Sequence, residues 1–452
     1  MTDFPHHTFR EYDIRGIAGS EITRELAYSL GKAYAAMLPE FEARPVIVGR
    51  DVRLSGPQLQ AAVIQGLHDA GLNVIDVGIV PTPLAYYAVY QLDAAGSVQI
   101  TASHNPGEYN GFKMMVGKSS LHGDDIQQLK QLMLQEHANA STPGTTVQRD
   151  IAEEYINFVA NDCPLAQPMK VVIDAGNGPS GMIAAPLYRR LGCEVIELYC
   201  EPDGNFPNHH PDPTVAANLV DLARTVVEQK ADLGIAFDGD GDRIGIVDEQ
   251  GLIVWSDMLL LLLSRQLLNT HPGATIISEV KCSQHMYDGI RQAGGKPVMW
   301  RTGHSPIKAK MKETGALLAG EMSGHMFFAD RFFGFDDAAY AGARVMQMLT
   351  EAGSTFSDLL YDVPHAESTP EIRVECSDES KFALVDRAVS HFSQLGYDII
   401  DIDGMRIQFD DGWGLLRASN TQPALVMRFE APGKERLTEM QALFDDWLRQ
   451  NR

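Results

Sequence analysis

Residues 45–80 read PVIVGRDVRLSGPQLQAAVIQGLHDAGLNVIDVGIV. The apolar run at residues 45–48 predicts a short buried strand, and residues 73–80 predict a second strand. A helix is expected between them, because Ser55 can cap its N-terminus and apolar residues from 59 to 67 fall on one face. A strand, a helix and another strand in this order predict a parallel sheet with helices on both faces.

The same order of elements recurs farther along the chain. Further strands are expected at residues 170–174, 194–198, 274–280, 297–300 and 316–319, and a helix is expected at residues 183–191. We therefore expect three similar α/β domains with mixed, mostly parallel sheets.

The character of the sequence changes after about residue 364. Strands are expected at residues 371–375, 397–402, 405–409, 414–417 and 424–430, and helices at residues 381–395 and 435–448. Consecutive strands with two helices predict an antiparallel α+β domain. The predicted domains span residues 1–150, 151–251, 252–364 and 365–452.

Length and composition agree with several domains. A chain of 452 residues exceeds what one core usually organises, and its 44% apolar and 21% charged residues are typical of globular proteins. The formal net charge of -23 argues against nucleic-acid and acidic-membrane partners, because its field repels polyanions. Residues 1–13 lack the pattern of a secretory signal, and the longest apolar stretch, at residues 258–263, is too short to span a bilayer. The five cysteines are expected to be reduced thiols, and the protein is expected to be cytoplasmic.

The first chemical motif is TASHNP at residues 101–106, directly after an expected strand at residues 97–100. Its serine, Ser103, would lie at the carboxyl end of a strand, where open α/β sheets place ligands. A serine that merely caps a turn is the alternative. A hydrolase triad is disfavoured, because Ser103 and His104 are adjacent and need not face each other, and no GxSxG elbow is present.

The second motif is DGDGDR at residues 238–243, between expected strands at residues 233–237 and 244–247. Its three carboxylates can wrap onto one hard cation, because the glycines permit a tight backbone path. An EF-hand is disfavoured, since Arg243 stands where that loop needs glycine and strands flank the motif. Magnesium beside a phosphate is the better interpretation.

Two further motifs suit a phosphorylated sugar. In GEMSGH, at residues 320–325, the carboxylate of Glu321 can accept hydrogen bonds from two sugar hydroxyls. In RASNTQP, at residues 417–423, a guanidinium, two hydroxyls and an amide can surround a phosphate. A polar turn and an ordinary hairpin connection are the respective alternatives.

Together these four motifs, in this order and one in each expected domain, closely resemble the α-D-phosphohexomutases. The segments FREYDIRG at 9–16, GRDVRLSG at 49–56, GNFPNHHP at 204–211 and TGHS at 302–305 also look like the family, so the resemblance covers essentially the whole chain. The GEMSGH form is similar to that of bacterial enzymes acting on both mannose and glucose phosphates, whereas phosphoglucosamine mutases tend to carry glutamine at the position of Met322.

The resemblance implies a fold and a reaction. Three α/β domains and a C-terminal TATA-box-binding-protein-like domain would surround a central cleft. Ser103 would carry a phosphoryl group, and one Mg²⁺ per chain would be held by Asp238, Asp240, Asp242 and an oxygen of the phosphorylated Ser103. A hexose 1,6-bisphosphate would form as intermediate and activator, turn over in the cleft and return the other phosphate to Ser103.

It also implies roles for further residues. The expected catalytic residues are Ser103, His104, Lys113, Arg15, Arg243, His304 and His325. Among them Lys113, His325 and His304, in that order, are the candidate proton acceptors. The expected substrate-binding residues are Tyr12, Arg15, Lys281, His304, Glu321, Ser323, His325, Arg417, Ser419, Asn420 and Thr421.

Substrate choice follows from the same assignment. If Glu321 and Ser323 read the 3- and 4-hydroxyls, mannose and glucose are not distinguished, because these sugars differ at C2. We expect a monomer with hexose phosphates as its only partners and a hinge near residue 364 that lets the C-terminal domain close. A phosphoglucosamine mutase, a Mg²⁺-dependent sugar phosphatase and a noncatalytic calcium-stabilised binding protein remain alternatives.

Overall fold

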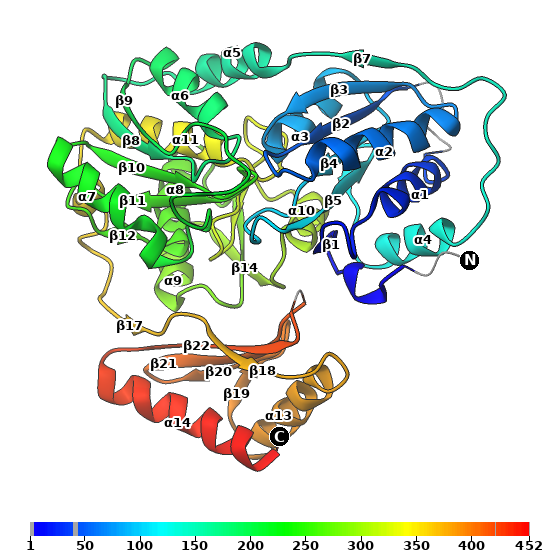
Figure 1. The fold of residues 1–452 in the computed structure, drawn as a ribbon. Helices are drawn as coiled ribbons and strands as arrows, with labels where there is room; N and C mark the ends of the chain where they lie inside the picture. The colour runs from blue at the N-terminus through cyan, green and yellow to red at the C-terminus, as the bar shows by residue number, and fades with distance from the viewer. Residues whose placement is uncertain (1–3, 39–43, 421, 452) are drawn as a thin grey trace. The chain divides into compact units, whose positions relative to one another are not determined.

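A computed structural model of the protein describes residues 4–38, 44–420 and 422–451 (Figure 1). The chain divides into two compact units. Unit 1 contains residues 1–259 and 323–359, and unit 2 contains residues 260–322 and 360–452. No helix in the described ranges combines the length and the apolar character needed to cross a membrane.

The first sheet of unit 1 is mixed. Its strands are β1 (Ile14–Ile17), β2 (Val46–Arg50), β3 (Val74–Ile79), β4 (Gly96–Ile100), β5 (Tyr109–Val116), β6 (Ser119–Ser120) and β7 (Thr146–Gln148). They follow the order β1-β5-β4-β2-β3-β7, with β6 paired to β5. Strands β4, β2, β3 and β7 are parallel, whereas β5 is antiparallel to both β1 and β4.

Helices accompany this sheet in the predicted strand–helix–strand order. They are η1 (His6–Thr8), α1 (Arg24–Ala35), α2 (Gly56–Asp69), α3 (Thr82–Gln91) and α4 (Asp124–Met133). Helices α1 and α2 pack unusually closely, because a Cβ atom at Gly66 would lie 2.3 Å from the carbonyl oxygen of Tyr28. Ser55 precedes α2 as predicted, but its side chain makes no capping hydrogen bond. Its hydroxyl instead accepts a bond from the Asn110 amide at 2.8 Å, so the predicted cap is wrong.

The second sheet of unit 1 carries the DGDGDR turn. Its strands are β8 (Lys170–Asp174), β9 (Glu194–Leu198), β10 (Leu233–Phe237), β11 (Ile244–Val247) and β12 (Ile253–Val254), in the order β12-β11-β10-β8-β9. The accompanying helices are α5 (Ala152–Asp162), α6 (Gly181–Arg190), η3 (Ala216–Leu219) and α7 (Val220–Gln229). Strand β10 is parallel to β8 and antiparallel to β11, so the turn between β10 and β11 reverses the chain at the carboxyl end of β10.

The next segment of chain contributes to both units. Strands β13 (Thr275–Glu279), β14 (Lys296–Trp300) and β15 (Leu318–Gly320) form a parallel sheet in unit 2, with β13 in the centre. Its helices are α9 (Gln284–Gln292) and α10 (His304–Thr314), and α8 (Ser256–Thr270) precedes them. Strand β16 (Met326–Phe328) and helices α11 (Ala338–Ala352) and α12 (Phe356–Leu359) belong to unit 1.

The C-terminal part of unit 2 is the predicted antiparallel α+β domain. It contains β17 (Glu367–Ser368), β18 (Ile372–Glu375), β19 (Asp398–Ile400), β20 (Met405–Phe409), β21 (Gly412–Ala418) and β22 (Ala424–Ala431). The order is β17-β22-β21-β20-β19, and β18 also pairs with β22. Helices α13 (Lys381–Gln394) and α14 (Lys434–Asn451) cover one face of this sheet, where Phe392 and Phe444 join its buried core (Figure 1).

The predicted fold class is therefore confirmed, with α/β sheets followed by an α+β domain. The four domain boundaries, the central cleft and the hinge near residue 364 stay predictions. All five cysteines are free in the structure.

Candidate active site

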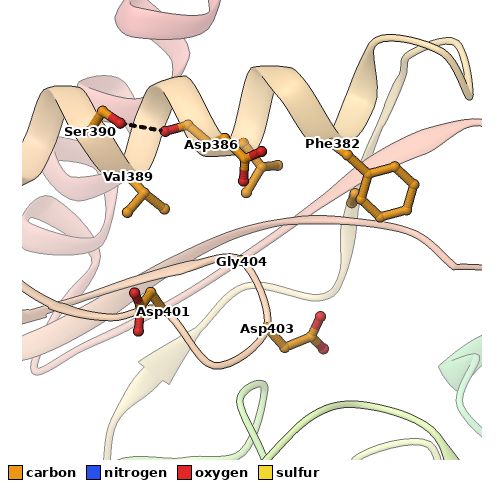
Figure 2. Close-up of a pocket in the computed structure, with 9 residues that line it drawn as sticks. Phe382, Asp386, Val389, Ser390, Asp401, Asp403 and Gly404 are labelled. Atoms are coloured by element: carbon orange, nitrogen blue, oxygen red, sulfur yellow. Dashed lines mark hydrogen bonds between the residues drawn. The ribbon is translucent and has the colours of Figure 1, made fainter.

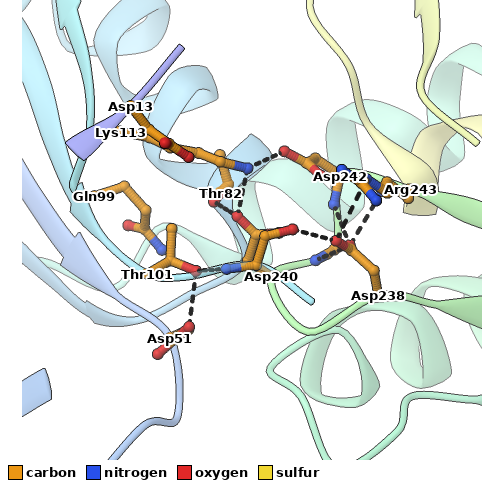
Figure 3. A network of polar contacts seen from close by, with 12 residues as sticks. Asp13, Asp51, Thr82, Gln99, Thr101, Lys113, Asp238, Asp240, Asp242 and Arg243 are labelled. Carbon is orange, nitrogen blue, oxygen red and sulfur yellow. Dashed lines mark hydrogen bonds and ion pairs between the residues drawn. The ribbon is translucent and has the colours of Figure 1, made fainter. Parts of the chain in front are cut away.

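Three buried carboxylates meet in the turn between β10 and β11. One oxygen from each of Asp238, Asp240 and Asp242 lies within 4.8 Å of the others (Figure 3). Backbone N–H groups of Gly241, Asp242 and Arg243 donate to Asp238 Oδ1 at 2.9, 3.1 and 3.2 Å. The turn thus fixes one oxygen of Asp238 and leaves Oδ2 directed at the neighbouring strands.

Ser103 lies opposite this turn, directly after β4. Its hydroxyl donates to Asp238 Oδ2 at 2.6 Å, and its oxygen lies 3.2 Å from His104 Nδ1. The adjacent serine and histidine therefore do contact each other. Burial and the cations Arg243, Arg15 and Lys113 lower the pKa of His104 well below its ordinary value, so the ring is neutral.

Lys113, on β5, neutralises part of the acidic cluster. Its ammonium donates to Asp240 Oδ2 at 2.8 Å and also pairs with Asp242 Oδ2 (Figure 3). Burial lowers the pKa of Lys113, but the carboxylates of Asp240 and Asp242 outweigh it and raise the pKa well above its ordinary value. Lys113 is therefore a cation in this arrangement.

The donor set fits a divalent metal ion. Asp240 Oδ1 and Asp242 Oδ1 are buried and accept no hydrogen bond in the structure. An unsatisfied buried carboxylate oxygen is costly, and the charges of Lys113 and Arg243 do not balance three carboxylates. Burial, together with the charges of Asp240 and Asp242, raises the pKa of Asp238 well above its ordinary value. An all-oxygen set of this kind suits a hard cation.

Arg243 is held beside the cluster by a histidine. Its Nε donates to His325 Nε2 at 3.1 Å and lies 3.9 Å from Asp238 Oδ2. Because a guanidinium only donates, the ring proton of His325 belongs on Nδ1, which lies 3.0 Å from Asp336 Oδ2. The acceptor nitrogen of His325 is thus engaged by Arg243, which makes His325 an orienting group in this arrangement.

Arg15, on β1, reaches the loop that carries Ser103. Its Nη1 donates to Asn105 Oδ1 at 2.6 Å, and Nη2 pairs with Asp13. Its Nε is buried and has no hydrogen-bond partner among the described residues. Tyr12 lies partly buried just before β1.

In unit 2, the predicted sugar reader Glu321 is buried at the end of β15. Its Oε1 accepts from the Gly303 N–H at 2.6 Å. A second buried carboxylate, Glu279, accepts from Met322 N and Thr302 Oγ1, both at 3.1 Å. Glu279 therefore ties the GEMSGH and TGHS loops together at the carboxyl ends of parallel strands. His304 is the first residue of α10 and is nearly buried.

The predicted phosphate-binding cations of unit 2 each have an acidic partner. Arg417 donates from Nε to Asp403 Oδ2 at 3.0 Å, and Lys281 pairs with Glu371 Oε1 at 2.7 Å. The Lys281 charge lowers the pKa of Glu371 to about 2. Ser419 and Asn420 follow Arg417 at the end of β21, whereas Thr421 lies outside the described residues.

A cavity of about 340 Å³ adjoins this region, between α13 and the turn before β20 (Figure 2). Phe382, Val385 and Val389 line one side, and Asp401 and Asp403 line the other. Its carboxylates would repel a phosphate, so the cavity is not a phosphate subsite.

Four residues with clear contacts to these loops were missed in the sequence. Asp51 and Arg53 fasten the Ser103 loop, Glu279 ties two loops of unit 2, and Lys381 donates to the carbonyls of Ser419 and Gln422 at 2.5 and 2.9 Å. The GRDVRLSG segment contains Asp51 and Arg53, whereas none of the predicted motifs contains Glu279 or Lys381.

Comparison with known proteins identifies the family. Models of phosphoglucomutase/phosphomannomutase α/β/α domains I, II and III match residues 6–140, 153–251 and 255–366, and the model of the C-terminal domain matches residues 371–446. A phosphomannomutase/phosphoglucomutase from Pseudomonas aeruginosa is 48% identical over 446 residues, which cover 98% of this chain and 96% of that protein. The chain belongs to this family.

Other members agree. A phosphoglucomutase from Neisseria meningitidis is 43% identical over 454 residues, which cover 100% of this chain and 98% of that protein. The crystal structure of a phosphoglucomutase/phosphomannomutase family protein from Burkholderia thailandensis superposes with a TM-score of 0.92 at 42% identity, covering 99% of this chain and 98% of that one. The predicted resemblance to the phosphohexomutases is confirmed, and this is a family of isomerases that act on hexose phosphates.

Proposed function

We propose that this phosphohexomutase interconverts the 1- and 6-phosphates of mannose and glucose through a phosphorylated Ser103. One observation carries the proposal: Ser103 Oγ lies 2.6 Å from a carboxylate of the three-aspartate cluster. Three cations, Arg15, Lys113 and Arg243, surround the same site. A hydroxyl beside a metal-binding cluster and several cations suits phosphoryl transfer, which needs positioning and charge stabilisation above all.

In the first half-reaction, the O6 atom of a bound hexose 1-phosphate attacks phosphorus. The O6–P bond forms while the bond between phosphorus and Ser103 Oγ breaks. The proton that leaves the sugar hydroxyl O6 is the proton that Ser103 Oγ takes up, so the serine is restored and a 1,6-bisphosphate is formed. The neutral ring of His104, 3.2 Å from Ser103 Oγ, can carry the proton at that atom.

The chain's own cations absorb the charge of the transferring group. Arg15 brings its guanidinium charge to the loop that carries Ser103, and Arg243 is oriented by His325. Lys113 acts as a cation in this proposal, because its two aspartate partners keep it protonated. Asp238, Asp240 and Asp242 would hold one Mg²⁺, which when bound supplies a Lewis acid for the phosphoryl oxygens.

The non-reacting phosphate would be bound in unit 2 by Arg417, Ser419, Asn420, Thr421 and Lys281. The bisphosphate would then reverse its orientation and phosphorylate Ser103 with its other end. His304 and Tyr12 would complete the sugar environment.

Glu321 and Ser323 would accept hydrogen bonds from the 3- and 4-hydroxyls of the sugar. Mannose and glucose have the same configuration at these two positions. The names of the relatives from Pseudomonas aeruginosa and Neisseria meningitidis support substrates of this class. The proposal also takes the protein to be a cytoplasmic monomer that hexose 1,6-bisphosphate activates.

The test is ³¹P NMR of the protein with Mg²⁺, a trace of glucose 1,6-bisphosphate, and mannose 1-phosphate or glucose 1-phosphate. Conversion of both to 6-phosphates without inorganic phosphate supports the proposal. Conversion of glucosamine 1-phosphate alone would refute the sugar assignment, and accumulation of inorganic phosphate would refute the mutase. Ser103→Ala is the control and should abolish conversion.

A further inference from the structure

Two sequence motifs have no part in the proposed chemistry, yet they meet beneath the loop that carries Ser103. They are GRDVRLSG at residues 49–56 and GNFPNHHP at residues 204–211. We infer that Arg53, in the first motif, is a positioning residue that fixes the backbone of Ser103 for phosphoryl transfer and is sealed in place by the second motif. The inference rests on the proposed function, because it assigns Arg53 to the same serine.

All five N–H groups of the Arg53 guanidinium are used. Nη2 donates to the carbonyl oxygens of Ser103 and Asn105, both at 2.6 Å. Nη1 donates to the carbonyls of Pro106 and Tyr109 at 2.6 and 2.9 Å, and Nε donates to Asp51 at 3.0 Å. The side chain is wholly buried. Four carbonyls of one loop thus converge on a single planar group.

The loop needs such a clamp because of its backbone conformation. Ser103 has φ = +50°, a left-handed conformation that residues other than glycine rarely adopt. Arg53 holds the carbonyl of Ser103 itself and that of Asn105, so it fixes the chain on the C-terminal side of the strained residue.

The backbone on the N-terminal side of Ser103 is fixed by the same Asp51–Arg53 ion pair. Asp51 Oδ2 accepts from the Thr101 hydroxyl at 2.7 Å (Figure 3). Thr101 Oγ1 in turn accepts from the Ser103 N–H at 2.9 Å. Asp51 also accepts from Arg53, so both sides of Ser103 are joined to one buried ion pair.

The second motif closes this site from outside. A Cβ atom at Gly204 would lie 2.4 Å from the carbonyl oxygen of Val52 and 3.1 Å from Arg53 Cα, so only glycine allows this approach. The ring of Phe206 lies over the Arg53 guanidinium at 5.3 Å. The aromatic ring thereby covers one face of the guanidinium and attracts its charge.

Lysine cannot replace this arginine. An ammonium has three donors and no planar fork, so it would leave loop carbonyls without partners. The Ser103 backbone would then reach other conformations, in which the hydroxyl no longer faces Asp238. Misplacement of a reacting atom by about 1 Å can lower a rate by about 100-fold.

The experiment measures the rate at which glucose 1,6-bisphosphate phosphorylates Ser103, by quenched-flow mass spectrometry, and the affinity for glucose 6-phosphate by calorimetry. Arg53→Lys should lower the phosphorylation rate about 100-fold and leave affinity within about threefold. The matched control is Arg344→Lys, since Arg344 is a buried arginine of unit 1 that pairs with Asp330 and touches no part of the site. It should lower the melting temperature without changing the phosphorylation rate.

Thr101→Val covers the case in which Arg53→Lys does not fold. It removes the hydroxyl between Asp51 and the Ser103 N–H but keeps the buried ion pair, and we expect a rate about tenfold lower. A rate for folded Arg53→Lys equal to that of Arg344→Lys would overturn the inference, and so would an unchanged rate for Thr101→Val where Arg53→Lys does not fold. Absence of Ser103 phosphorylation in the unsubstituted protein would instead overturn the proposed function.

Discussion

At the scale of single residues, the two oxygens of Asp238 have different partners: one holds the backbone of the turn, and the other faces the candidate site. Its Oδ1 accepts three backbone N–H groups, whereas its Oδ2 faces Ser103. Burial beside two further carboxylates makes its charge unfavourable unless a cation is present. The turn therefore stores repulsion that metal binding would relieve.

Asp238→Asn should abolish the effect of Mg²⁺ on stability. The amide oxygen can still accept the backbone N–H groups, but a charge and a ligand are lost. For the unsubstituted protein, Mg²⁺ at about 100 times its Kd should add about 2.7 kcal/mol to the free energy of unfolding. The variant should gain almost none of this, have a metal-free melting temperature at least as high as before, and lose turnover.

Thermal scans with and without Mg²⁺ measure this. Asp93→Asn, at an exposed aspartate, should respond to Mg²⁺ like the unsubstituted protein. An unchanged response in Asp238→Asn would contradict the assignment of this residue to the metal.

His209 offers a test based on pH. Its Nδ1 lies 2.9 Å from the His210 carbonyl oxygen, and its Nε2 lies 2.9 Å from an oxygen of the buried Asp174. Both partners only accept, so the ring is favoured in its charged form. Burial opposes this, but the bond to Asp174 and its charge raise the pKa of His209 above its ordinary value of 6.5.

Because the pKa of His209 is raised in the folded state, its stabilisation is fully present below pH 6.5 and is lost as pH rises through the folded value. The free energy of unfolding of His209→Gln should thus differ most from that of the unsubstituted protein in acid, and the gap should narrow toward alkaline pH. Urea titrations over this range measure it. His365→Gln, at an exposed histidine, is the control, and a gap that widens with pH would refute the assignment.

At the scale of elements, the first residue of α13 anchors a loop. Lys381 is buried at the helix N-terminus, where the helix dipole disfavours a cation. It is retained there by the carbonyls of Ser419 and Gln422 and by Asp378. These contacts fix the shape of the turn that is predicted to bind phosphate.

Lys381→Met should therefore raise KM for glucose 1-phosphate about tenfold, since the turn loses charge-assisted hydrogen bonds worth about 1.5–3 kcal/mol. The value of kcat should change little. Lys434→Met is the matched control, because Lys434 is also the first residue of a helix in the same domain but is exposed. Steady-state kinetics decide, and equal KM values for the two variants would count against the role of Lys381.

The elements differ in how well the sequence predicts them. Strands β8, β9, β10, β11 and β20 have the predicted bounds. The first four contain short apolar runs, whereas β20 alternates apolar and polar residues. Strands β1 and β5 were not predicted, since Arg15 interrupts one, and Asn110 and Lys113 interrupt the other. Arg15 and Lys113 face the candidate site. Charged residues at such positions interrupt the apolar pattern from which a strand is predicted.

At the scale of the whole molecule, the sequence predicts candidate site residues but not the residues that support them. The three aspartates follow from the spacing of DGDGDR, whereas the assignment of Ser103 rests on the resemblance to the phosphohexomutases, because an isolated SHNP favours a capping serine. The Arg53 clamp joins residues 50 apart in sequence, and Lys381 reaches residues 38 and 41 farther along. Such contacts arise only when the chain folds, so neither the charge nor the apolar periodicity of the sequence predicts them.

A substitution at Trp413 gives a prediction at the scale of the whole molecule. Trp413 lies within unit 2, where the C-terminal sheet meets the loop after β13. It is fully buried beneath the Arg406 guanidinium at 3.8 Å and donates to Glu430 at 2.9 Å. Trp413→Ala should cost about 3–5 kcal/mol in unit 2 and leave unit 1 unaffected.

Calorimetry should then show two separate transitions, of which only one is shifted, because proteins of several domains seldom unfold in two states. Trp255→Ala, at a partly exposed tryptophan of unit 1, should not produce this shift. A single unfolding transition of Trp413→Ala that shifts as a whole would contradict the prediction.

The most direct test of the account is whether Ser103 itself passes on the phosphoryl group. The protein would be labelled with ³²P-glucose 1,6-bisphosphate, freed of ligand, mapped by peptide mass spectrometry, and chased with unlabelled mannose 1-phosphate and Mg²⁺. We predict that the label resides on Ser103 and moves entirely into mannose bisphosphate and 6-phosphate. Label on another residue, or its release as inorganic phosphate, would contradict the account.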